Sequence, residues 1–154
     1  MYNYFLNTEK RSIFHKFIFH GRYFVSLYHN LNKTIMKKNK IIYYVATGLL
    51  TLLMLFSASM YVFNHEAIVQ AFKSFGYPTY VIYPLATAKI LGLIALWFVN
   101  NKTIKEWAYA GFFFNFLLAF FAHVMIGDGE QMGALLAFIF LSVSYVFGKK
   151  IGKH

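Results

Sequence analysis

The sequence predicts an all-α integral membrane protein, a four-helix bundle with both ends of the chain in the cytoplasm. Long apolar stretches, a low content of charged residues and a one-sided distribution of lysines predict it. The 154 residues are 59% hydrophobic and 13% charged, with a formal net charge of +10, whereas an average soluble domain is about 25% charged. This composition argues against a soluble globular domain, and still more against a disordered chain.

Four stretches are long and apolar enough to cross a bilayer, whose hydrocarbon core of about 30 Å needs about 20 helical residues. They are residues 41–63, 81–99, 107–126 and 131–148. None alternates in the manner of a membrane barrel strand. The first could instead be a cleaved signal peptide, because Ser57-Ala58-Ser59 resembles a cleavage site. Its apolar run exceeds the roughly 7–15 residues of a signal peptide, so we expect it to be retained.

The lysines predict the orientation of the bundle. Lys37, Lys38 and Lys40 lie directly before the first stretch, two lysines lie between the second and third, and three follow the fourth, whereas the other two loops hold Lys73 alone. The positive-inside rule therefore places both ends of the bundle in the cytoplasm.

Residues 1–35 differ from the rest of the chain. They are rich in Tyr, Phe, Asn and His, and they contain no apolar run long enough to span a membrane. Met36-Lys37-Lys38 resembles the natural start of a bacterial membrane protein. Our preferred interpretation is that translation begins at Met36. The alternative is a basic and aromatic segment that lies on the membrane surface.

A short helix is expected in the first outer loop, over residues 65–75. Its apolar residues recur at helical spacing, and Gly76 followed by Pro78 is typical of a helix end. We expect this helix to lie in the membrane interface.

Lys89 is the one charged residue inside the second stretch. A lysine at the centre of a membrane helix costs roughly 2.5–3.5 kcal/mol on translocon scales, so a partner is expected. Because side chains tilt toward the N-terminus of a helix, the ammonium should point to the outer face. Its partner could be Glu66, Asp128 or water, or the side chain could simply extend to the interface.

Other polar residues gather at the expected outer half of the bundle. Glu66 follows the first stretch, His123 lies near the end of the third, and Asp128 follows it. Asn115, in the middle of the third stretch, lies on the stripe that leads to His123. With Lys89, these residues are the candidates for a site that binds an anionic or quinone-like headgroup or relays protons.

Several kinds of site find no support in the sequence. With no cysteine, the chain has no thiolate metal site, iron–sulfur cluster or cysteine nucleophile. The His and carboxylate residues lack a metal-ligand spacing, so no metal is expected, and no nucleotide-binding or hydrolase motif is present. The basic residues are split into short flanks, which argues against a nucleic-acid partner.

Five runs of residues resemble the DoxX-like family of small bacterial four-helix membrane proteins. They are YYVATGLLTLLMLFSA (43–58), FGYP (75–78), AKILG (88–92), KEWAYAGF (105–112) and AH (122–123). The resemblance covers about residues 40–150 and leaves residues 1–35 without a counterpart. It implies the bacterial cytoplasmic membrane and, through the family's name, a context of quinone-linked redox chemistry.

Two functions follow from these expectations. The first is an accessory subunit of a quinone-linked redox system, with a quinone as the implied cofactor and a redox protein as the partner. The second is a small-molecule transporter, or a protein that binds a lipid or metabolite in the same outer site. An autonomous enzyme is not favoured, because His123 is the only histidine in the four stretches and cannot hold a haem between two histidines. A homo-oligomer remains an alternative assembly.

Overall fold

The computed structural model describes the backbone of residues 2–154 and the side chains of residues 23–154. In this part of the chain every regular element is helical, which confirms the all-α prediction. The chain divides into two units, Met1–Lys38 and Asn39–His154. The first unit consists of the N-terminal part of helix α1 (Tyr2–Phe63), and its side chains from residue 23 onward are exposed.

The second unit contains the remainder of α1 and four further helices. These are α2 (His65–Ser74), α3 (Ile82–Phe98), α4 (Lys102–Ile126) and α5 (Gln131–Lys150), with a 3₁₀ turn η1 (Thr79–Val81) before α3. Four helices of the described chain, α1, η1 with α3, α4 and α5, are long and apolar enough to cross a membrane. The predicted stretches 41–63, 81–99, 107–126 and 131–148 fall almost entirely within them.

One apolar core joins the four long helices within the second unit. Leu50 and Met54 of α1 pack with residues of α3, α4 and α5, and the most central side chains are almost completely buried. The other core members are Leu93, Leu96, Tyr109, Phe112, Phe116, Ala137 and Leu141. Outward-facing side chains of the same helices are largely apolar and exposed, as expected for helices surrounded by lipid.

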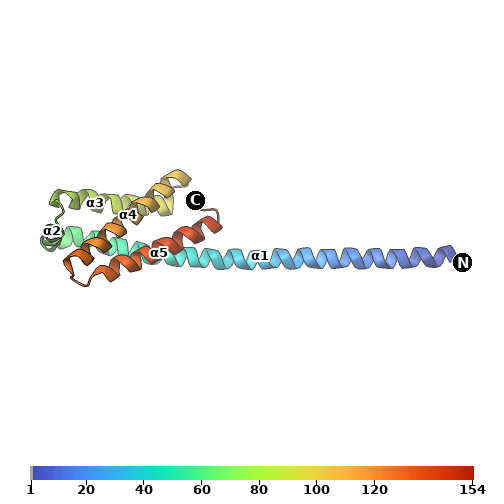
Figure 1. Ribbon diagram of the computed structural model, residues 1–154. Helices are drawn as coiled ribbons and strands as arrows, with labels where there is room; N and C mark the ends of the chain where they lie inside the picture. Colours follow the sequence, from blue (N-terminus) through green and yellow to red (C-terminus); the bar gives the residue numbers. More distant parts are fainter. Residues whose placement is uncertain (1) are drawn as a thin grey trace. The chain divides into compact units, whose positions relative to one another are not determined.

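Helix α2 lies where α1 ends, opposite the C-terminus (Figure 1). This end of the bundle, the α2 end, also carries the loop between α4 and α5, because the Phe75 and His123 rings lie 5.0 Å apart. Helix α2 ends as the sequence predicts: Gly76 has φ +74°, and the Tyr77 N–H donates to the Phe72 carbonyl at 2.8 Å. The position of α2 in a membrane interface stays a prediction, as does the orientation of the bundle.

Helix α4 begins five residues before the apolar stretch that predicted it. The Asn101 side chain accepts hydrogen bonds from the backbone N–H groups of Thr103 and Ile104, at 2.9 and 3.3 Å. It thus satisfies two of the N–H groups that lack a partner within the helix. Hydropathy marks where a helix enters lipid, whereas this cap determines where the helix starts.

Candidate functional site

Lys89 is the charged side chain that the fold buries within the bundle at the α2 end. It retains only 4% of its exposed surface. Its Nζ donates to the Ser57 hydroxyl at 2.8 Å and lies 4.0 Å from the centre of the Tyr61 ring. Ser57 and Tyr61 are four residues apart on α1, so they share one face of that helix. The ammonium points toward the end of α1, the direction that the side-chain tilt predicts.

The partners of Lys89 are neutral. Among the residues whose side chains are described, no carboxylate lies within ion-pair distance of its Nζ. A hydroxyl oxygen and the face of an aromatic ring both attract a cation, but neither carries a compensating charge. Of the partners considered from the sequence, Glu66 and Asp128 are therefore not the ones that contact it. Ser57 and Tyr61 contact it, and their four-residue spacing indicates only that they share a face of α1, not that this face meets Lys89.

Aromatic packing holds Tyr61 in position. Its ring makes an edge contact with Phe72 of α2 at 5.8 Å between centroids. One turn further along, the His65 Nδ1 lies 3.3 Å from the Tyr61 carbonyl oxygen, and the His65 ring stacks on Tyr83 of α3 at 5.1 Å. Helices α1, α2 and α3 are thus tied together around the Lys89 ammonium.

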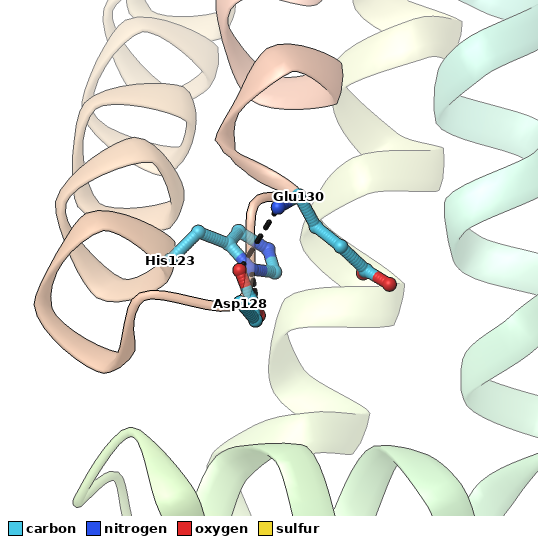
Figure 2. A group of neighbouring side chains, drawn as sticks. All are labelled: His123, Asp128 and Glu130. Atoms are coloured by element: carbon cyan, nitrogen blue, oxygen red, sulfur yellow. Dashed lines mark hydrogen bonds and ion pairs between the residues drawn. The ribbon is translucent and has the colours of Figure 1, made fainter.

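His123 and Asp128 form a direct pair at the same end of the bundle (Figure 2). The His123 Nδ1 lies 2.7 Å from the Asp128 Oδ2. Because a carboxylate only accepts hydrogen bonds, the Nδ1 of His123 carries the donated proton. The other Asp128 oxygen, Oδ1, accepts the backbone N–H of Glu130 at 2.9 Å. The sequence prediction that these two residues lie near each other is therefore met by a hydrogen bond.

The Asp128 carboxylate is stabilised in its charged form. The hydrogen bond from the Glu130 backbone N–H, followed by the one from His123, holds the pKa of Asp128 below its ordinary value of 3.8. Both side chains keep part of their surface exposed, at 21% for His123 and 28% for Asp128. The pair is consequently a surface feature of the loop, unlike Lys89.

Glu130 adds a third group of the metal-ligand type. Ligand atoms of His123, Asp128 and Glu130 all lie within 4.8 Å of one another, a proximity that their spacing in the sequence did not predict. The two carboxylate residues are exposed. Exposed acidic groups often gather in this way without an ion, so we assign no metal to them.

Glu66 and Asn115 take part in neither group. Glu66 is exposed in the first turn of α2, and Asn115 is half-buried in the middle of α4. Within residues 23–154, neither side chain has a hydrogen bond or ion pair. Of the five candidates, the structure therefore joins only His123 to Asp128 and leaves Lys89 with partners of its own.

A buried polar network at the opposite end of the bundle was missed by sequence reasoning. Ser144 of α5 bonds to the Thr47 hydroxyl of α1 at 2.7 Å and to the Tyr109 hydroxyl of α4 at 2.8 Å. Ser144 and Thr47 are completely buried. Hydrogen bonds between small polar side chains hold membrane helices together, and single Ser and Thr residues in apolar stretches gave no signal that they would meet.

Comparisons with known proteins identify one family. The model of the DoxX-like family matches residues 45–145, which is well over half of the chain. The matched segment includes Ser57, Tyr61, Lys89, His123 and Asp128, and it excludes the N-terminal unit. No curated protein and no solved structure matches the chain.

Proposed function

Because the chain belongs to the DoxX-like family, we propose that it is an accessory subunit of a quinone-linked redox system in the bacterial cytoplasmic membrane. Its multi-pass architecture supports a role within the lipid bilayer. The redox context comes from the resemblance to the family and has to be tested on this protein.

The chain's own residues favour an accessory role over independent redox catalysis. The chain has no cysteine, and its four apolar stretches hold a single histidine, His123. A haem held between two histidines of the spans, or a cluster held by thiolates, would thus have to be supplied by another protein. We accordingly propose a catalytic redox protein as the partner.

The observation that carries this proposal is the buried Lys89 ammonium with neutral partners. A buried cation without a counter-charge is unfavourable, and a carbonyl oxygen of a bound quinone would give it a further acceptor. The isoprenoid tail of a quinone would lie in the surrounding lipid. Ser57 and Tyr61 would then hold the ammonium in place at 2.8 Å from the hydroxyl and 4.0 Å from the ring centre.

Isolation from native membranes tests the accessory role. The full chain, tagged and extracted in a mild detergent, should bring with it a protein that carries a flavin or haem spectrum and reduces or oxidises a quinone. Lys89→Met should retain the protein partner but lower the rate of quinone turnover in the isolated complex. Lys73→Met, which removes the same charge from an exposed position on α2, should leave that rate unchanged. Isolation of a homo-oligomer alone would contradict the proposal.

The same ammonium also favours the second candidate, a protein that transports or binds an anionic lipid or metabolite. This function predicts a bound lipid or substrate-dependent uptake without any redox partner. The isolation experiment separates the two candidates, because only the first brings a flavin or haem protein with it.

A further inference from the structure

The Lys89 ammonium offers only hydrogen-bond donors to a ligand, whereas the neighbouring Ser57 and Tyr61 hydroxyls can both donate and accept. The ammonium has three N–H groups and accepts no hydrogen bond, and only Ser57 takes one of its protons. The Tyr61 hydroxyl has no hydrogen bond among the described residues. Ser57, Tyr61 and Lys89, the Lys89 cluster, therefore present several unused donors in one place.

Ser57 differs from most of the other Ser and Thr residues described in α1 and α3. Hydroxyl groups of this kind usually donate back to a carbonyl three or four residues earlier, and five of those described in α1 and α3 do so. These are Thr34, Thr47, Thr51, Ser59 and Thr87, at 2.7–3.0 Å. Ser57 has no such bond among the described residues; its oxygen instead accepts from Lys89. Its own proton thus remains available to a ligand.

The positive charge of Lys89 favours the same kind of ligand as the unused hydrogen-bond donors, one that presents oxygen acceptors. Lys89 is 4% exposed, and its direct contacts supply no negative charge. A ligand hydroxyl could also accept from the ammonium through its oxygen, but its own proton would then need a separate acceptor beside the buried cation. A group with oxygen lone pairs would turn its negative end toward it, and hydrogen bonds to a charged partner are about twice as strong as neutral ones.

We infer that the Lys89 cluster recognises a lipid-soluble molecule whose headgroup offers oxygen acceptors and no donor. It therefore favours the oxidised form of a quinone over the quinol, and a carboxylate over the matching alcohol. The quinone part of this inference rests on the proposed function, whereas the carboxylate part rests on the donors and the charge alone.

Matched ligand pairs test this preference on the full chain in lipid nanodiscs. The first pair is duroquinone and its quinol, measured without oxygen, and the second is dodecanoate and dodecanol. Calorimetric titration, corrected with empty nanodiscs, gives the affinity for each. Since a hydrogen bond to a charged group contributes about 1.5–3 kcal/mol, the acceptor headgroup should bind about tenfold or more tightly than its hydroxyl counterpart.

Variants of the cluster show whether that preference arises there. Lys89→Met should abolish the preference, and Ser57→Ala should reduce it while keeping the charge. Lys73→Met should leave it intact, because Lys73 is exposed on α2. If Lys89→Met does not yield folded protein, Ser57→Ala carries the same test.

Each outcome decides between the inference and the proposed function. A preference within the carboxylate pair alone, with no binding of either quinone form, supports the inference and contradicts the quinone role. Binding of both quinone forms with equal affinity, and no preference in the carboxylate pair, overturns the inference and leaves the quinone role standing. Binding of neither pair, or a preference that survives in Lys89→Met, overturns the inference.

Discussion

Gly92 of α3 lies directly against the Phe112 ring of α4, and adding one methyl group there should weaken the bundle. A Cβ at Gly92 would lie 2.7 and 2.9 Å from two ring carbons of Phe112, whereas carbon atoms pack best at about 3.5–4 Å. The Phe112 ring is 3% exposed and stacks on Phe116 at 6.0 Å, so it has little room to move. Overpacking of this kind typically costs about 1–3 kcal/mol.

The net effect of Gly92→Ala also includes the higher helix propensity of alanine, worth about 1 kcal/mol in its favour. We therefore expect the free energy of unfolding to fall by about 0–2 kcal/mol. Gly111→Ala is the matched control, because a Cβ at Gly111 of α4 meets nothing within 4 Å. The propensity gain cancels in the comparison, so the two variants should differ by about 1–3 kcal/mol.

Unfolding in mixed micelles with increasing dodecyl sulfate, followed by circular dichroism, measures both variants under the same conditions. Equal stability of the two alanine variants, or a more stable Gly92→Ala, would refute the packing of α3 against α4 described above.

Three further predictions concern the ends of the helices and the buried network. Ser144→Ala should lower the free energy of unfolding by about 1 kcal/mol, because the Thr47 and Tyr109 hydroxyls lose their hydrogen bonds to it. Ser142→Ala removes an exposed hydroxyl that is bonded within its own helix, so it should change the free energy little. Equal losses in the two variants would contradict the network. Asn101→Ala should destabilise α4 by about 1 kcal/mol through loss of its N-cap, and an unchanged unfolding midpoint would argue against the cap. Hydrogen bonds from the Glu130 backbone and from His123 lower the pKa of Asp128. The charged carboxylate therefore stabilises the fold at pH values above 3.8, the ordinary pKa of the group. This stabilisation is lost as the pH falls through the lowered pKa of the folded protein. Thermal midpoints of the wild type and Asp128→Asn should then converge in acid and separate toward neutral pH, whereas parallel curves would show that the bonds to His123 and the backbone contribute nothing.

The spans were predictable because lipid imposes a single requirement on each of them, a helix of about 20 apolar residues. The end of α1 and the end of α2 followed from local signals, the last apolar residue at Phe63 and the glycine at position 76. The start of α4 did not, since the cap by Asn101 lies among polar residues that hydropathy assigns to a loop. Side-chain capping and burial in lipid are separate effects, and an apolar stretch indicates only the second.

The site was predictable in part. The position of Lys89 and the direction of its ammonium followed from the cost of a charge in lipid and from side-chain tilt. The identity of its partners did not, because it depends on how α1 is rotated against α3, which composition does not specify. Ser57 and Tyr61 face Lys89, whereas Glu66, one of the two acidic partners expected from the sequence, is exposed on α2.

The quinone content of purified protein tests the central claim most directly, since it depends on the Lys89 ammonium and on no other assumption about partners. Wild-type chain, Lys89→Met and Lys73→Met are purified from the same native membranes, and the quinone extracted per mole of protein is measured by mass spectrometry. We expect near-stoichiometric quinone in the wild type and in Lys73→Met, and about a tenth or less in Lys89→Met, as the loss of one hydrogen bond to a charged group implies. Equal quinone in all three proteins, or none in the wild type, would contradict the account.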